Sequence, residues 1–379
     1  MGSKPWKRGR WIPGVLNQQQ MWELCKEGYI RNITAKSSED LDASSLDLHI
    51  ADEAFRLDAS IKPSRINGKC FGQLLDEYGK RLPPKRDGKY DLDKGHIHIF
   101  KLKESLAGLV RSGEIHGLAT ARSTIGRVDV LARLIVDGMD RYDSFDSSSL
   151  KTGDMYVEVI PVTFNVRVMP GFCLNQLRLF CGRPEESVIS APGFGKYVGI
   201  KQTANDPAML SVNLEKTQVG DSKASALCAK GNNGRIDLWT RLRKGKYDPM
   251  PYWDRKLASR KRLLIERNKF YILRSKERLA VPDGVAIYCQ ATDETIGEMR
   301  IHYAGFVHPW FGCFNPEREV RNGAPLIFEV RGHLTNVNLR DGEKLARLTF
   351  YRMSKPAKEK HSVYDKQELK LSSLFKDWP

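Results

Sequence analysis

An internal repeat constrains the fold of this 379-residue chain more than any other feature of its sequence. Residues 155–180 align without a gap on residues 326–351. The identical pairs are Glu158/Glu329, Val159/Val330, Asn165/Asn336, Val166/Val337, Gly171/Gly342, Leu174/Leu345 and Leu177/Leu348. Self-similarity of this kind is the signature of a duplicated structural unit. The alignment therefore predicts two copies of one fold in tandem.

Two shorter blocks support the duplication because they match in the same order along the chain. They pair 45–48 with 211–214, and 100–107 with 273–280. The copies meet within residues 183–207, a stretch that contains several Gly, Pro and Ser residues. We therefore expect one repeat in residues 1–190 and the other in residues 191–379.

Each repeat has the pattern of a β-protein. Apolar and polar residues alternate in 156–160, 164–168 and 96–100, which is the period of half-buried strands. Gly171 and Gly342 occupy matching turns between strands. Many short strands with regularly spaced turns are typical of jelly rolls and distorted barrels. The predicted fold class is therefore mainly β, with two tandem barrel-like, jelly-roll-like repeats and a few short helices.

Two segments favour helices. Asn17 and Gln20 fit a capping box, and Gly28 follows the last turn, so a helix is predicted over residues 17–27. We also expect a short basic helix at residues 256–267.

The chain carries a large positive excess, with 62 Lys and Arg against 46 Asp and Glu and a net charge of +16. Such an excess attracts polyanions, whether nucleic acid, an acidic membrane surface or a polyphosphate ligand. The basic residues cluster in 4–10, 80–89, 241–246 and 255–267, and each cluster can equally be a solvated surface. No apolar run reaches the ~18 residues of a membrane span, and no apolar signal core follows the N-terminus. We expect a cytoplasmic protein without a membrane partner.

The seven cysteines argue against zinc. No pair has Cys-x-x-Cys spacing, and no His-x-Glu motif precedes a Pro-Cys-x-x-Cys motif. Those are the patterns of structural zinc sites and of zinc-dependent nucleobase deaminases. We therefore expect reduced, mostly structural thiols and no protein-bound metal.

The segment Ala121-Arg-Ser-Thr-Ile-Gly-Arg-Val-Asp129 is a candidate phosphate cradle. Arg122 and Arg127 supply forked donors that match phosphate oxygens, and the Ser123 hydroxyl adds a short donor. An exposed loop of no chemical role is the alternative for such a short motif.

Glu158 and Glu329 stand at matching positions in apolar strands, where a carboxylate is costly unless it is used or paired. A buried Glu near a phosphate-binding loop can act as a general base, because desolvation raises its pKa. Each can instead be an outward-facing strand residue, because the alternation permits either face.

The order of these motifs resembles the dCTP deaminase and dUTPase superfamily, and specifically its tandem two-repeat bacterial dCTP deaminases. Arg122-Ser-Thr-Ile-Gly-Arg127 is similar to the family's Arg-Ser-Ser-x-x-Arg motif, and Ala304-Gly-Phe-Val-His-Pro-Trp-Phe-Gly312 resembles its nucleoside hairpin. The other matching segments are the start at 17–30, Ser44-Ser-Leu-Asp-Leu48, Pro170-Gly-Phe-Cys-Leu-Asn-Gln-Leu177, and the tail Tyr364-Asp-Lys-Gln367 with the nearby Leu-Lys-Leu-Ser. The resemblance covers most of the chain, and it implies two dUTPase-like repeats.

The resemblance implies hydrolysis of dCTP to dUTP and ammonia by a glutamate-activated water, without zinc and with Mg²⁺ bound through the substrate triphosphate. It also implies sites between domains and a homo-oligomer. Ser123 would orient the water and contact phosphate, and Arg122 and Arg127 would neutralise phosphate charge. Glu158 and Glu329 both stand at the family's catalytic glutamate position.

The two repeats differ at these motifs. Repeat two has Asp293, Glu294 and Glu298 where repeat one has the Arg and Ser residues of the cradle, and these carboxylates would repel a triphosphate. Repeat two keeps the hairpin that begins at Ala304, whereas repeat one has a Ser- and Asp-rich insertion there.

We therefore expect one composite site. Its residues are Arg122, Ser123 and Arg127 from repeat one, with Ala304, Glu329, Tyr364 and Gln367 from repeat two. A site that uses Glu158 is the alternative, and Tyr364 and Gln367 can instead belong to a disordered terminus. His308 stands where the family usually has Asp next to the sugar, or is an ordinary turn histidine.

Other functions stay open at this point. The chain can be a bifunctional dCTP deaminase and dUTP diphosphatase, or a non-catalytic nucleotide-binding regulator with a decayed site. A nucleic-acid-binding β-protein is the third and least favoured class. Its basis is the charge of +16 and the basic residues of 241–267.

Overall fold

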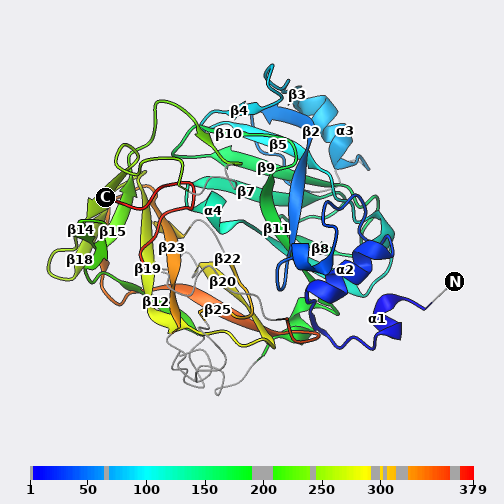
Figure 1. Ribbon diagram of the computed structural model, residues 1–379. Helices are drawn as coiled ribbons and strands as arrows, with labels where there is room; N and C mark the ends of the chain where they lie inside the picture. The colour runs from blue at the N-terminus through cyan, green and yellow to red at the C-terminus, as the bar shows by residue number, and fades with distance from the viewer. Residues whose placement is uncertain are drawn as a thin grey trace.

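The computed structural model describes residues 3–63, 68–189, 208–239, 245–291, 299–301, 305–312, 323–358 and 368–379. We call the described residues up to 189 the first half, and those from 208 onward the second half. The strands form a nearly closed barrel-like sheet and a half-barrel, with few helices (Figure 1). The predicted fold class, mainly β with barrel-like sheets and a few short helices, is confirmed.

The first half contains one nine-stranded sheet and short helices around it. Its helices are α1 (Pro5–Arg8), α2 (Gln18–Lys26), α3 (Phe71–Tyr78) and α4 (Ser123–Gly126), with the 3₁₀ turns η1 (Ser38–Asp40), η2 (Ala107–Leu109) and η3 (Pro184–Ser187). Its strands are β1 (Gly14–Val15), β2 (Leu46–Leu57), β3 (Lys80–Arg81), β4 (Tyr90–Leu92), β5 (Ile97–Leu102), β6 (Ile115–Ala121), β7 (Val130–Val136), β8 (Ser144–Asp146), β9 (Met155–Pro161), β10 (Val166–Val168) and β11 (Cys173–Cys181).

The described part of the second half forms a second nine-stranded sheet and two short ribbons. Its strands are β12 (Met209–Asn213), β13 (Thr217–Val219), β14 (Ser222–Ala224), β15 (Ala226–Ala229), β16 (Ile236–Asp237), β17 (Trp253–Lys256), β18 (Arg262–Ile265), β19 (Phe270–Leu279), β20 (Val285–Ala291), β21 (Met299–Ile301), β22 (Gly305–Val307), β23 (Ala324–Gly332), β24 (Val337–Arg340) and β25 (Lys344–Arg352).

The strand order is the same in the two large sheets. The first runs β7-β9-β5-β2-β11-β6-β8. In the second, the pairings give β21-β23-β19-β12-β25-β20-β22, which corresponds strand for strand along the chain. The second sheet differs by β15 and β17, which extend it beside β19. The shared order supports the proposal that one unit was duplicated.

The helix predicted at the N-terminal side is confirmed. Helix α2 begins after Asn17, whose side chain accepts a hydrogen bond from the backbone N–H of Gln20 at 3.0 Å. The side chain of Gln20 in turn accepts from the backbone N–H of Asn17 at 3.2 Å. Gly28 follows with φ +76°, a conformation that glycine adopts at little cost.

The basic helix predicted at 256–267 is wrong. This segment contains the end of β17 and all of β18, joined by a turn in which Arg260 and Lys261 have positive φ. Leu263 and Ile265 are buried while Arg262 and Leu264 are exposed, which is the period of a strand. The apolar alternation therefore overrides the helix propensity of the Arg and Lys residues.

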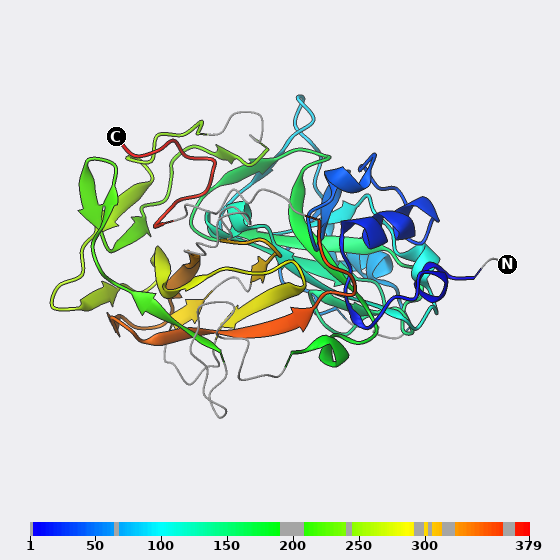
Figure 2. The same ribbon diagram turned by 60° about the horizontal axis from the view of Figure 1, so that its bottom comes forward.

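The two halves share a hydrophobic core. One cluster combines Val166 of β10 with Leu227 and Trp253 of the second half, and with Leu371 and Phe375 of the C-terminal segment. Strand β16 also pairs in parallel with β10. Figure 2 shows the halves lying against each other, with the N- and C-termini at opposite sides of the view.

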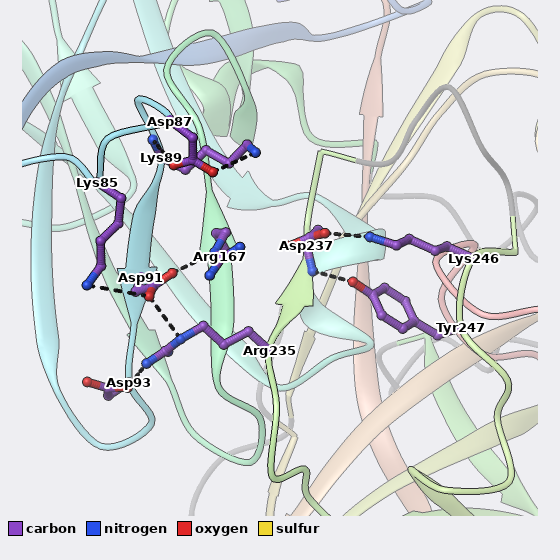
Figure 3. Close-up of polar contacts among 10 residues, drawn as sticks. All are labelled: Lys85, Asp87, Lys89, Asp91, Asp93, Arg167, Arg235, Asp237, Lys246 and Tyr247. Carbon is purple, nitrogen blue, oxygen red and sulfur yellow. Dashed lines mark hydrogen bonds and ion pairs between the residues drawn. The ribbon is translucent and has the colours of Figure 1, made fainter.

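Charged residues cross the same boundary (Figure 3). The carboxylate of Asp91 in β4 lies 2.6 Å from Nε of Arg167 in β10 and 3.2 Å from Nε of Arg235, which comes from the second half. Arg235 also contacts Asp93 at 2.5 Å. Part of the positive excess is therefore paired with carboxylates inside the molecule.

Candidate active site at helix α4

The candidate phosphate cradle forms a tight loop between β6 and β7. Helix α4 is a single turn, and Asp129 ends the loop with φ 53°. Arg122 precedes the helix, and its Nη1 lies 2.7 Å from Oδ2 of Asp47 in β2. Burial raises the pKa of Asp47, and the Arg122 cation offsets part of that rise. The ion pair ties the loop to the Ser44–Leu48 motif that the sequence singled out.

Arg127 and Thr124 bind the C-terminal segment. Nη1 of Arg127 lies 3.4 Å from the carbonyl oxygens of Lys370 and Leu371. The Ser372 hydroxyl donates to the carbonyl oxygen of Thr124 at 2.9 Å. The tail therefore lies against α4, more than two hundred residues away in sequence.

Glu329 of β23 lies directly against the same loop. A Cβ atom built on Gly126 would stand 2.2 Å from Oε2 of Glu329, so any larger residue at this position would require the carboxylate to move. Burial raises the pKa of Glu329 to about 8, while the Arg127 cation lowers it and the Asp129 carboxylate raises it. The structure thus brings together the cradle of the first half and a buried carboxylate of the second.

An ion pair beside Glu329 joins the two halves. Nη2 of Arg331 donates to Oδ2 of Asp129 at 2.6 Å and to the Thr163 hydroxyl at 2.7 Å. Alternate residues of a strand point to the same face, so Glu329 and Arg331 both face the α4 loop. Asp129 is fully buried, and this contact fixes β23 against the loop.

Glu158 has a different environment. It is fully buried in β9, and its Oε1 accepts from Nη2 of Arg133 at 2.5 Å. Its Oε2 accepts from the hydroxyls of Ser60 at 2.5 Å and Tyr142 at 3.4 Å. These contacts all come from the first half, and none of them is in the α4 loop.

The nucleoside hairpin of the sequence prediction is described in part. Its β22 strand pairs with β20, and Nδ1 of His308 lies 2.9 Å from Oγ of Ser44. Ala304, Tyr364 and Gln367 lie outside the described residues, as do Asp293, Glu294 and Glu298.

The sequence reasoning gave Gly126 only a loosening role in the loop, and it missed Asp129, Arg331 and Arg178. Gly126 and Asp129 lie inside the 121–129 motif, and Arg331 is two residues beyond Glu329. Their nearness in sequence to the predicted site residues could have indicated them. Nothing in the sequence pointed to Arg178, because its partners are distant in the chain.

The described residues contain no group of three His, Cys, Asp or Glu side chains that could hold a metal ion. Among the helices of the described ranges, none has the length and apolar character to cross a membrane.

Comparisons with known proteins cover nearly the whole chain. Residues 12–183 match the family model of the 2′-deoxycytidine 5′-triphosphate deaminase (DCD) N-terminal domain, and residues 196–375 match that of the C-terminal domain. The fold is similar to the crystal structure of 2′-deoxycytidine 5′-triphosphate deaminase from Agrobacterium tumefaciens, with a TM-score of 0.77 and 24% identity over 91% of this chain and 99% of that chain. No curated protein matches the sequence.

Proposed function

Since the chain belongs to the 2′-deoxycytidine 5′-triphosphate deaminase family and is a dCTP deaminase, we propose that it carries out this reaction in the composite site where Glu329 meets the α4 loop. In this site Arg122, Ser123 and Arg127 bind the triphosphate, which brings Mg²⁺ with it. The observation that carries the proposal is the buried carboxylate of Glu329 against Gly126 and beside Arg127.

Glu329 acts as the general base. It takes a proton from a water molecule as the water oxygen bonds to C4 of the cytosine, and the tetrahedral species then forms. The abstracted proton passes to the amino nitrogen, the C4–N bond breaks and ammonia leaves. The proton of the new C4 hydroxyl moves to N3 as the C4 carbonyl forms, which gives dUTP. A base with a pKa near the working pH is best suited to this proton transfer. Burial raises the pKa of Glu329 to about 8, which is close to neutral pH.

The environment of Glu158 supports this choice between the two glutamates. Its carboxylate already accepts from Arg133, Ser60 and Tyr142, so its oxygens are engaged by the protein. An ion pair and hydrogen bonds of this kind compensate a carboxylate for its burial. Glu158 therefore organises the first half, and Glu329 serves the reaction.

Matched glutamine variants test the assignment. Glu329→Gln removes the base without changing the shape of the side chain, so release of ammonia from dCTP should fall by about 10²–10⁴-fold. Glu158→Gln is the control, because it makes the same change at the matching position of the other half. It should keep most of the activity per folded molecule, although the loss of its pairing with Arg133 lowers stability. The reverse pattern would contradict the proposal.

The same assay separates the alternatives. Pyrophosphate from dUTP, measured beside ammonia from dCTP, identifies a bifunctional enzyme. Salt-sensitive binding of single-stranded DNA, measured in parallel, tests whether the chain also binds nucleic acid.

We propose separately that the chain forms a homo-oligomer, and that neighbouring chains can share a site. Because the α4 loop and Glu329 come from one chain, this contact needs no neighbour. Sedimentation of the intact protein tests the oligomeric state.

A further inference from the structure

Asp129 is an anion buried between the two halves, at the end of the α4 loop. Its side chain is fully buried, and its backbone has φ 53°, a conformation that Asp and Asn tolerate better than most residues. Both hydrogen bonds to its carboxylate fall on Oδ2, from Arg331 and from the Thr163 hydroxyl. Oδ1 is buried and has no hydrogen-bond partner among the described residues. A buried carboxylate needs a counter-ion, and within the described ranges Arg331 supplies it.

The contacts of Arg331 hold its guanidinium in one orientation. Its Nη2 bridges Asp129 and the Thr163 hydroxyl at 2.6 and 2.7 Å, and its Nη1 donates to the carbonyl oxygen of Asn268 at 2.5 Å. A guanidinium is planar and carries its donors in a fixed fork, so acceptors in several directions fix its plane. These contacts direct the charge of Arg331 to Asp129 and hold β23 to the loop.

Glu329 lies two residues before Arg331, on the same face of β23. It is 7% exposed, and within the described part of the chain no hydrogen bond or ion pair engages its carboxylate. Burial raises its pKa to about 8, the Arg127 cation opposes that rise, and the Asp129 carboxylate adds to it. A like charge disfavours the ionised form of a carboxyl group. The ionisation of Glu329 therefore depends on how far the charge of Asp129 is balanced.

Neighbouring strands add little net charge around Glu329, as far as the described residues show. Cys289 of β20 stays neutral, because burial and the charge of Glu329 raise its pKa to about 12. In β19, the residue opposite Glu329 is the apolar Ile272. Arg274, two residues further along β19, is paired with Glu368 of the C-terminal segment. The charges that decide the ionisation of Glu329 therefore come from the α4 loop and from β23.

From these contacts we propose that Arg331 is a positioning residue for the reaction: it holds the α4 loop against β23 and balances the charge of Asp129, so that Glu329 is ionised and can accept a proton. This role rests on the proposed function, in which Glu329 is the base. Without Arg331, an unbalanced buried anion would stand near the base and keep it protonated. Without Asp129, Arg331 would lose the acceptor that ties β23 to the loop.

Carbon NMR of the intact protein tests the charge balance without substrate. The protein is labelled with ¹³C-glutamate, and the carboxyl signal of Glu329 is assigned by its loss in Glu329→Gln. Asp129→Asn keeps the shape of the side chain, suits φ 53° and removes the negative charge, so the titration midpoint of Glu329 should fall by about one pH unit. Arg331→Met leaves Asp129 unbalanced, so the midpoint should rise by about one pH unit.

The double variant with Asp129→Asn and Arg331→Met keeps the proposal testable if Arg331→Met alone does not fold. It leaves no unpaired buried charge, and its midpoint should return close to that of the unaltered protein. Arg235→Met is the control, because Arg235 also pairs with an aspartate across the boundary, Asp91. It should lower thermal stability without moving the midpoint of Glu329. A midpoint that is the same in every variant would overturn the proposal.

The pH profile of kcat/KM for dCTP separates this proposal from the proposed function. If Glu329 is the base, the kinetic inflection should move with the NMR midpoint in Asp129→Asn and in Arg331→Met. Midpoints that move while the inflection stays would show that Glu329 is not the base, and the charge balance would stand. If neither moves, in an enzyme that Glu329→Gln inactivates, the base stands and the role of Arg331 fails.

Discussion

At the scale of single residues, the site depends on two neighbours of one carboxylate. Gly126 leaves the space that Glu329 occupies, and Arg127 supplies the nearby positive charge. Desolvation exceeds the attraction of the cation, so the net effect is a raised pKa. The raised pKa of Glu329 and the space beside Gly126 each have a consequence that can be measured.

The first consequence concerns pH. Glu329, the proposed base, must be ionised to accept a proton, and its pKa is about 8. We therefore expect kcat/KM for dCTP to rise about tenfold per pH unit below 8 and to level off above it. Because the Arg127 cation lowers the pKa of Glu329, Arg127→Gln should move the inflection to higher pH. Steady-state rates between pH 6 and 9.5 measure both profiles. A flat profile below pH 8 would argue against Glu329 as the base.

The second consequence concerns space. In Gly126→Ala the new Cβ would stand 2.2 Å from Oε2 of Glu329, so the carboxylate must move. A displacement of about 1 Å in a catalytic group can cost about 10²-fold in rate. We expect kcat to fall by at least tenfold. Gly284→Ala is the control, since a Cβ there meets nothing within 4 Å. Equal kcat values in the two variants would show that Glu329 tolerates the shift.

At the scale of elements, the C-terminal segment completes the loop. Residues 368–379 return to the first half, bury Leu371 and Phe375 in its core and bring Ser372 to Thr124. The sequence placed a closing tail here by resemblance, but the described contacts come from the Leu-Lys-Leu-Ser part. The roles of Tyr364 and Gln367 in the site stay predictions.

Helix α2 could be predicted from its local capping residues. Strand β18 could not be predicted from local propensity, because its alternating burial depends on a partner strand.

Ser372→Ala tests the tail. It removes the hydrogen bond to the Thr124 carbonyl, a contact worth about 1 kcal/mol, so KM for dCTP should rise about fivefold as α4 loosens. Ser373→Ala is the control, because Ser373 is exposed and next in sequence. Initial rates over a range of dCTP concentrations separate KM from kcat. An unchanged KM in Ser372→Ala would show that α4 keeps its geometry without this contact.

At the scale of the whole molecule, the halves form one structural unit. The core cluster, the β10–β16 pairing and the Asp91 network all cross between them. The repeats predicted at residues 1–190 and 191–379 stay a prediction. Each half covers apolar surface of the other.

A single unfolding transition should follow from this shared core. In calorimetry the van't Hoff and calorimetric enthalpies should agree, as they do for one cooperative unit. Asp91→Asn should lower the midpoint, because it weakens contacts with Arg167 and Arg235 across the boundary. Asp58→Asn should leave it nearly unchanged, because its pair with Lys80 is exposed. Two separate transitions would show that the halves unfold independently.

The sequence alone determined the β class and the early helix, and it singled out the α4 segment and the two glutamates. These features follow from local periodicity and from matches along the chain. Tertiary structure decided that Glu329, and not Glu158, lies against Gly126, and that Arg178 reaches His308 through Ser44. The reason is physical: alternation in a strand shows which residues share a face, but the packing of distant strands decides what that face meets.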